Sequence, residues 1–340
     1  MYDIIAAGSA TEDVFVTSDE THVITLADRN SERPYLALPY GAKIPVSNIA
    51  LSTGGGATNT AVSFARQGMK TGIVCKVGVD GPGDRVLDAL TSEGVGTSLC
   101  LRTAGAQTGY SLIITGFTGD RTVLVYRGAS SQLAREDVNW DALAETEWIY
   151  TSSFADGSAS MYFEFARFAR DKGIKLATNP GGTQIKLGLE GLSEALAATH
   201  VVFLNMDEAR ELTCVEPDCT DADDHEVLKR LHAAGCRYVV VTDGARGAQG
   251  YDGETHYHVP VYPVEEASTV GAGDAFAAAC VAGLQRGLSL RDALRCGAAN
   301  AAGVVTHFGA KEGILTWQGI QDFIAAHGDE ALVTGEEEKL

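Results

Sequence analysis

The chain is short of basic residues. Only 26 lysines and arginines stand against 45 aspartates and glutamates among 340 residues, which gives a formal net charge of −19 at pH 7. Nucleic-acid binding needs a basic face, so this balance argues against a nucleic-acid partner. It leaves room for one bound nucleotide, which needs only local hydrogen-bond donors and a metal ion.

Paired cysteines and long apolar runs are also lacking. The seven cysteines are scattered along the chain without a metal-binding spacing, which makes a disulfide framework improbable. The longest apolar runs are too short to cross a bilayer, and the N-terminus lacks the basic region and apolar stretch of a signal peptide. We therefore expect a cytoplasmic protein with no membrane partner.

What the sequence does contain is an alternation of short β-rich runs and helical patterns. This alternation is typical of a mostly parallel sheet covered by helices on both faces, and it predicts an α/β fold of the Rossmann-like, three-layer α/β/α type. The expected strands are 2–7, 71–77, 148–152, 175–178, 201–204 and 238–242. The expected helices are 59–67, 83–93, 158–172, 206–212, 225–234, 275–286, 290–307 and 318–327.

Two segments interrupt this alternation. Residues 14–50 carry β-prone patches, including one at 42–46, and residues 110–126 have the pattern of a hairpin. Together they predict a small β-sheet lid that would exclude water from a site, although the hairpin could instead pack flat on the core. The remaining segments are assigned to an α/β core (1–13, 51–109 and 127–330) and to a solvated acidic tail (331–340).

The stretch Ser-Thr-Val-Gly-Ala-Gly-Asp-Ala-Phe at 268–276 is the most informative in the chain. A helical pattern follows it, so Asp274 is expected in the first turn of a helix, where free N–H groups and the helix dipole favour negative charge. Gly271 and Gly273 would let a phosphoryl group approach the main chain closely. Asp274 is therefore a candidate base for a nearby hydroxyl, or else only a cap of the helix.

Three further segments follow candidate strands. The glycine cluster at 54–68 opens a helix, but the third glycine of a dinucleotide fingerprint would fall at Asn59, so it fits a polyol or a plain tight turn better. Residues 242–247 run from a strand into a glycine-rich turn where a phosphate or ribose can lie. Asn205 and Glu208, one helical turn apart, suit either a hydrated magnesium ion or a capping box.

These four elements, in this order and each behind a strand, resemble the ribokinase-like (PfkB) family of carbohydrate and nucleoside kinases. The resemblance extends from residues 8–13 to residues 298–305. It implies ATP- and Mg²⁺-dependent transfer of the γ-phosphoryl group to a hydroxyl of a sugar or sugar-like acceptor, with catalysis mainly by positioning and charge stabilisation. It also implies a β-sheet lid that often serves as a homodimer interface.

The resemblance implies a role for each matching position. Asp274 matches the catalytic base, and Gly271, Ala272 and Gly273 match the anion hole for the γ-phosphoryl group. Acceptor-binding positions are Asp13, Gly55 and Asn59. Nucleotide positions are Asn205 and Glu208 for magnesium and phosphates, Thr242, Gly244 and Gly247 for the phosphates, and Asn300 beside the adenine.

The sequence departs from the family pattern at positions that bear on cation activation and on the range of expected acceptors. Ser268 stands where most members carry an aspartate that helps bind an activating monovalent cation, which puts activation by potassium in doubt. Thr11, Gly56 and the stretch 151–154 differ from ribokinase near the sugar, so a true ribokinase is disfavoured.

The Tyr126-Arg127 pair is similar to that of fructokinases and keto-deoxy-gluconate kinases. Arg127, together with Lys43 of the lid, would then contact an acidic or phosphorylated acceptor, or else Arg127 is simply an exposed lid residue. A nucleoside kinase is the closest alternative, and it would need an aromatic platform from Phe15, Tyr35, Tyr40 or Phe117. A more distant alternative is a sugar-sensing protein with a degenerate catalytic site.

Overall fold

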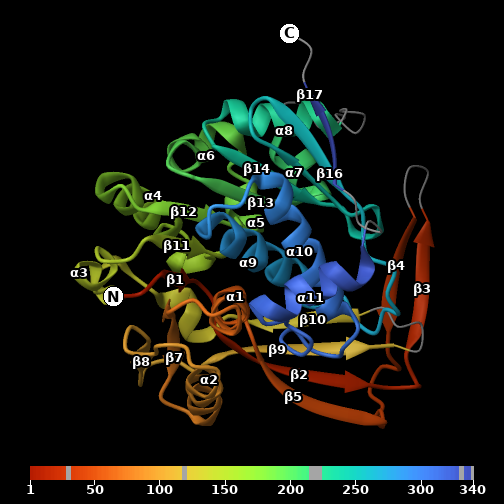
Figure 1. The fold of residues 1–340 in the computed structure, drawn as a ribbon. Helices are drawn as coiled ribbons and strands as arrows, with labels where there is room; N and C mark the ends of the chain where they lie inside the picture. The colour runs from red at the N-terminus through yellow and green to blue at the C-terminus, as the bar shows by residue number, and fades with distance from the viewer. Residues whose placement is uncertain (28–31, 117–120, 214–223, 329–332, 338–340) are drawn as a thin grey trace.

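The main body of the protein is a nine-stranded sheet. The computed structural model describes residues 1–27, 32–116, 121–213, 224–328 and 333–337. The strands lie in the order β17-β16-β15-β14-β13-β12-β11-β1-β6 (Figure 1). Six are parallel: β1 (Ile4–Ala7), β6 (Thr71–Val74), β11 (Trp148–Thr151), β12 (Lys175–Thr178), β13 (Val201–Asn205) and β14 (Tyr238–Thr242). Antiparallel strands complete one edge: β15 (Ala248–Tyr251), β16 (Thr255–Val259) and β17 (Thr334–Glu337).

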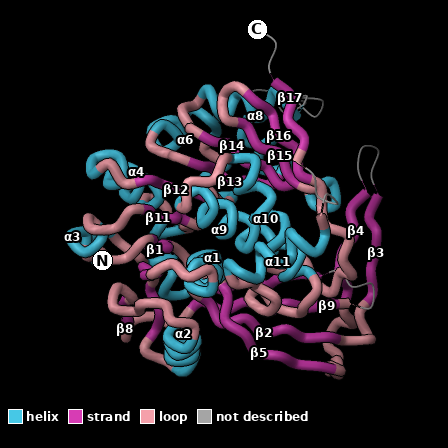
Figure 2. Tube along the Cα trace, in the orientation of Figure 1, coloured by secondary structure: helices cyan, strands magenta, loops and turns pink. Residues whose placement is uncertain are grey.

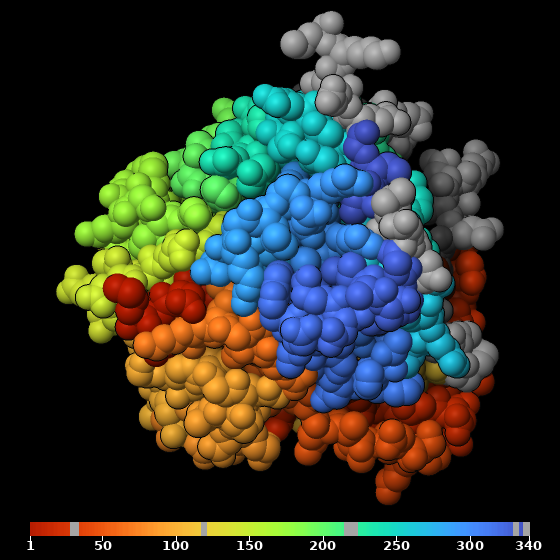
Figure 3. Space-filling view, in the orientation of Figure 1, coloured from red at the N-terminus to blue at the C-terminus, as the bar shows by residue number. Residues whose placement is uncertain are grey.

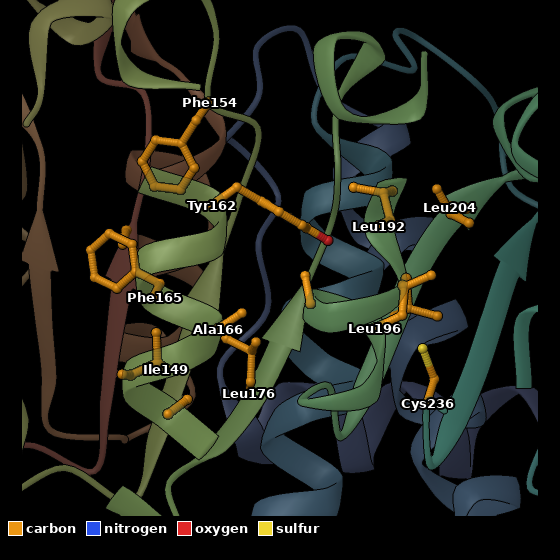
Figure 4. Packing of buried hydrophobic residues seen from close by; sticks show 14 of the residues in the cluster. Ile149, Phe154, Tyr162, Phe165, Ala166, Leu176, Leu192, Leu196, Leu204 and Cys236 are labelled. Atoms are coloured by element: carbon orange, nitrogen blue, oxygen red, sulfur yellow. The ribbon is translucent and has the colours of Figure 1, made fainter. Parts of the chain in front are cut away.

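Helices cover both faces of this sheet (Figure 2). Alternate residues of a strand therefore face different apolar layers: in β14, Val239 and Val241 belong to one buried cluster and Val240 to the other. The first cluster, part of which is drawn in Figure 4, includes α4 (Met161–Lys172), α6 (Gly188–Ala197), α7 (Met206–Thr213) and α8 (Asp224–Ala233). Tyr162 and Phe165 project from one helix toward different parts of this cluster (Figure 4). The second includes α9 (Ala272–Gln285), α10 (Leu290–Val305) and α11 (Trp317–His327).

The remaining helices are α1 (Gly56–Arg66), α2 (Gly81–Ser92), α3 (Trp140–Leu143) and α5 (Gly182–Ile185). Helices α1 and α2 share a third buried cluster with the β1–β6 edge of the sheet. Within the described residues, no helix has the length and apolar character needed to cross a membrane.

Helix α9 is apolar on every side because it lies between the sheet and other helices. All residues from Ala275 to Leu284 are buried. A Cβ at Gly297 of α10 would lie 2.9 Å from the Phe276 ring, so this close helix crossing depends on a glycine. The packing fixes the N-terminal turn of α9, and with it Asp274, beside the start of α1.

A second, smaller sheet lies apart from the main one. Its four strands have the order β10-β9-β2-β5, with β2 (Thr11–Thr17), β5 (Asn48–Gly54), β9 (Gly109–Thr115) and β10 (Arg121–Tyr126). A hairpin of β3 (His22–Ala27) and β4 (Glu32–Ala37) stands beside it, at the right of Figure 1. A short parallel pair, β7 (Lys76–Gly78) and β8 (Leu101–Thr103), completes the fold. The predicted α/β/α fold with a small separate sheet is thus confirmed.

Several segments differ from the sequence predictions. Residues 42–46 form no strand, and Pro45 among them lacks the N–H that a ladder needs, so β5 begins only at Asn48. Helices α3, α5 and α6 were not among the predicted helices. The acidic tail is not simply solvated, since residues 334–337 pair with β16 at the open edge of the sheet. An edge strand presents unpaired backbone N–H and C=O groups with which such a segment can pair.

Candidate active site

The first turn of α9 is shaped for the approach of an anion. Gly271 caps the helix with φ 80°, a left-handed conformation that favours glycine. A Cβ at Gly271 would also lie 2.5 Å from the carbonyl oxygen of Ala310, so a side chain would have no room. At Gly273, by contrast, a Cβ would meet nothing within 4 Å. The main chain of this turn thus packs tightly against Ala310 at Gly271 and is open at Gly273.

The Asp274 carboxylate faces the start of α1. Its Oδ2 accepts a hydrogen bond of 2.8 Å from the Asn59 amide nitrogen. Burial raises the pKa of Asp274 to about 6, and the Asn59 donor and the charge of Lys311 both oppose that rise. A base with this pKa is mostly ionised at neutral pH and still basic enough to take a proton.

The Asn59 carbonyl oxygen is an unused acceptor beside Asp274. Asn59 is 7% exposed, and its Oδ1 accepts no hydrogen bond from the described residues. Buried polar atoms in native proteins normally have partners. An orphaned acceptor next to a candidate base suits a bound hydroxyl group.

A cavity of about 430 Å³ lies on the open side of the α9 turn. Ala272 and Gly273 line it at one end, and Thr242, Gly244 and Gly247 line it where β14 ends. The rest of the lining is largely apolar and comes from residues 259–264 and from Ala298, Ala301, Ala302 and Val305 of α10. Open main chain at one end and an apolar slot at the other fit the phosphates and the base of a nucleotide.

A second cavity of about 140 Å³ lies near the start of α1. Gly55 lines it, and a Cβ on the next residue, Gly56, would lie 3.7 Å from Asp274 Oδ1. Hydroxyl groups dominate its walls: Ser9, Thr11, Ser111, Ser130, Ser131, Ser153 and Ser158. Such a polar pocket fits a ligand with many hydroxyl groups.

Arg127, a predicted acceptor-binding residue, lies at this second cavity. It lines the wall and faces Asp156 at 3.6 Å, with both side chains about half exposed or more. Asp13 lies deeper, 8% exposed, and accepts a hydrogen bond of 2.8 Å from Thr11. Lys43, also predicted to contact the acceptor, is exposed in the loop between β4 and β5 and lines neither cavity.

Asn205 and Glu208 form a reciprocal capping box at the start of α7. The Glu208 N–H donates to Asn205 Oδ1 at 2.8 Å, and the Asn205 N–H donates to a Glu208 carboxylate oxygen at 3.0 Å. Burial raises the pKa of Glu208. No group of three acidic, histidine or cysteine side chains suited to a metal occurs in the described part of the chain. The pair therefore fits magnesium only as a hydrated ion held mostly by phosphates.

Asn300, predicted beside the adenine, lies behind the wall of the large cavity. Its side chain is fully buried, and it donates to Ser63 Oγ and the Ala275 carbonyl oxygen and accepts from the Leu315 N–H. It does not line the large cavity itself, although its neighbours Ala298 and Ala301 do. These hydrogen bonds link α10 to α1 and α9.

Two cationic residues near the site were missed by the sequence analysis. Arg121, at the start of β10, donates a hydrogen bond of 2.7 Å to Thr269 Oγ1, and Thr269 lines the large cavity. Lys311 is 7% exposed in the loop after α10 and acts electrostatically on Asp274. Neither residue lies in a glycine-rich or strand-end motif, and a single sequence carries no other signal for them.

A family model described as pfkB family carbohydrate kinase matches residues 21–317. The chain belongs to the pfkB family of carbohydrate kinases. It is a sugar kinase, a phosphotransferase that acts on a hydroxyl group. The family to which the sequence motifs point is thus confirmed.

Relatives of this sugar kinase cover most of its length. It is 27% identical over 303 residues to the ribokinase of Haemophilus influenzae, which spans 88% of this chain and 95% of the relative. It is 29% identical over 297 residues to the 5-dehydro-2-deoxygluconokinase of Clostridium perfringens, with 82% and 85% covered.

Solved structures agree in fold. The ribokinase of Thermotoga maritima has a TM-score of 0.79 at 20% identity and covers 96% of this chain and 100% of its own. The ribokinase of Arabidopsis thaliana complexed with ribose and ATP has the same TM-score at 21% identity, with 95% and 98% covered.

Proposed function

We propose that this kinase transfers the γ-phosphoryl group of ATP to a hydroxyl of a sugar or sugar-like acceptor, with Asp274 as the general base. One observation carries the proposal: Asp274 has neighbours at both cavities. Its preceding residue, Gly273, lines the large cavity, and its carboxylate faces Asn59 and Gly56 beside the small one. A nucleotide and a polyol in these cavities would meet at the carboxylate.

The open main chain from Gly271 to Gly273 would stabilise the transferring phosphoryl group. Free N–H groups at a helix N-terminus bind anions, and here the Cβ position of Gly273 is empty. Asn205 and Glu208 would orient a hydrated Mg²⁺, which neutralises phosphate charge when bound. An Escherichia coli protein of this fold was solved in complex with ATP and Mg²⁺, with a TM-score of 0.77 at 21% identity.

The small cavity favours a sugar or sugar acid over a nucleoside. Its wall of hydroxyl groups suits a polyol, and Arg127 suits a carboxylate or phosphate at one end of it. The aromatic platform that a nucleoside would need is missing from this lining, since Phe15, Tyr35 and Tyr40 do not contribute to it. Phe117 lies outside the described residues. A relative named 5-dehydro-2-deoxygluconokinase is consistent with an acidic acceptor.

We further propose that the small sheet acts as a lid and as the interface of a homodimer. Large apolar side chains are exposed on its strands, among them Ile49, Leu51, Val123, Leu124 and Val125. Contiguous exposed apolar surface marks an interaction site. Size-exclusion chromatography with light scattering tests this: a mass of twice 35.7 kDa is expected, and a Leu124→Glu variant should dissociate.

The experiment that tests the function is nucleotide turnover against a panel of sugars, sugar acids, sugar phosphates and nucleosides. Asp274→Asn serves as the blank, since it keeps the shape of the side chain without its basicity. We expect ADP release with a sugar or sugar acid in the wild type and background turnover in the variant. Tight ATP binding with no turnover on any acceptor would instead favour a sugar sensor.

A further inference from the structure

Lys311 is a buried cation that the mechanism above does not use. It lies in the loop between α10 and α11, where its exposed fraction is 7%. Its ammonium donates hydrogen bonds to the carbonyl oxygen of Thr53 at 2.5 Å and to the Thr53 hydroxyl at 2.7 Å. A buried ammonium costs free energy unless negative charge lies near it, so the surrounding carboxylates are informative.

The loop that carries Lys311 contacts both sides of the active site. On the phosphate side, the Ala310 carbonyl oxygen lies only 2.5 Å from the position that a Cβ on Gly271 would take. On the acceptor side, Thr53 precedes Gly54, where a Cβ would lie 1.8 Å from Asp13 Oδ2. Figure 3 shows the C-terminal part of the chain (blue) meeting the N-terminal strands (orange) along one border. Lys311 is therefore held where the two halves of the site join.

Two carboxylates of the site interact with this charge. The ammonium of Lys311 lowers the pKa of Asp274 against the effect of burial, and Asp13 and Asp274 both stabilise the charged lysine. Burial still lowers the pKa of Lys311 to about 8, so it remains mostly charged at neutral pH. No ion pair within 4 Å joins Lys311 to either carboxylate in the part of the chain described, so the interaction acts through space.

The other charged groups nearby have partners of their own. Glu93 also acts on Lys311, but it is paired with Arg66 at 2.6 Å, and Arg66 donates to the Lys311 carbonyl oxygen at 2.7 Å. Glu312 accepts from the Lys311 N–H at 3.3 Å. Glu12, next to Asp13 on β2, is paired with Arg85. Asp13 has no such arginine among its described contacts and accepts only from Thr11.

We propose that Lys311 is a positioning residue whose buried charge, held against Thr53 on one side and next to the Gly271 turn on the other, keeps Asp274 ionised so that it can take the proton of the acceptor. This inference rests on the proposed function, in which Asp274 faces the acceptor. A fixed cation near a buried carboxylate favours the ionised form of that carboxylate. In this protein the cation is the side chain of Lys311.

The first test is the pH dependence of kcat/KM. Two neutral variants, Lys311→Met and Lys311→Gln, should move the acidic midpoint upward by about one pH unit. Activity then falls about fivefold at pH 6 and is unchanged at pH 8.5, where Asp274 is ionised in any case. The KM for the acceptor should rise while the KM for ATP stays constant, and Lys311→Arg should restore the midpoint.

Lys175→Met is the matched control, because Lys175 pairs with Glu147 at the opposite end of the strands. The Lys175→Met variant should leave the pH profile of kcat/KM unchanged. An unchanged midpoint in both neutral variants would overturn the inference, even if overall activity drops, since a merely structural role lowers activity at every pH.

The second test needs no kinase activity. A double-mutant cycle of Lys311→Met and Asp274→Asn is measured by urea unfolding at pH 7.5 and at pH 4.5. The shifts in midpoint should be non-additive at pH 7.5 and additive at pH 4.5, where Asp274 is protonated. Additive shifts at both values would overturn the inference; Lys311→Gln replaces Lys311→Met if the latter does not fold. If no acceptor is ever found, the proposed function fails while the cycle still decides the role of Lys311.

Discussion

The two cavities near Asp274 are built from different parts of the chain. The large one is made mainly of main chain and apolar side chains on the core, with glycines at 244, 247 and 273. The small one is made largely of side-chain hydroxyl groups, with Arg127, contributed by β2, β9, β10 and the connecting segments around them. Backbone N–H groups can bind the phosphates of any nucleotide. The side chains of the small cavity, by contrast, would determine which acceptor binds. The comparison therefore assigns general chemistry to the core and specificity to the border with the small sheet.

The largest effect is expected at Asp274, near both cavities. Asp274→Asn should lower kcat by about 10²–10⁴-fold, because the amide cannot take the proton of the acceptor. Nucleotide affinity, measured by calorimetry, should change little, since the large cavity is lined by residues other than Asp274. Asp84→Asn on the surface of α2 is the control. A kcat within a few-fold of wild type would remove Asp274 as the base.

A methyl group on the donor side should have the next largest effect. Gly273→Ala adds a Cβ that meets nothing within 4 Å, so the protein should fold with an unchanged melting temperature. The same methyl would stand between a phosphoryl group and the main chain, and we expect kcat to fall about a hundredfold with every acceptor. Gly182→Ala, also in open space but away from both cavities, is the control. An effect limited to one acceptor would contradict the division between the two cavities.

Arg127 tests the acceptor side of the same division. Arg127→Met should lower kcat/KM about 10- to 100-fold for acidic acceptors, because a hydrogen bond to a charged group is lost. For neutral sugars we expect no more than a few-fold change. The ratio of the two values is the measurement, and Arg135→Met, which removes a surface pair with Glu164, is the control. Equal losses of kcat/KM for acidic and neutral acceptors would show that Arg127 does not interact with the charge of the acceptor.

The same division explains how much the sequence could predict. Gly271, Gly273 and Asp274 act through local chain geometry at a strand or helix end, and a contiguous motif records that geometry. The glycine-rich turn after β14 was predictable for the same reason. The mostly parallel sheet covered by helices follows from the alternation of apolar runs and helical patterns, because parallel strands buried on both faces read as nearly continuous apolar runs.

Other residues depend on geometry that no local motif encodes. The contacts of Asn300 depend on the rotation of α10, which decides whether a residue faces the cavity or α1. Lys43 lies in an exposed loop and lines neither cavity. Lys311 meets Thr53 across 258 residues and Arg121 meets Thr269 across 148 residues. Such contacts exist only once the whole fold is formed.

Arg121 gives the smallest and most specific test, because it links the small sheet to the phosphate side. Removing one hydrogen bond between partly exposed groups costs a factor of roughly two to ten, so Arg121→Met should lower kcat/KM by that much. Thr269→Val removes the other partner of the 2.7 Å contact. If the contact itself matters, the double variant should lose no more than either single variant, whereas independent losses would multiply. Multiplied losses would mean that Arg121 acts elsewhere, and that the small sheet influences phosphoryl transfer without touching the loop that precedes Asp274.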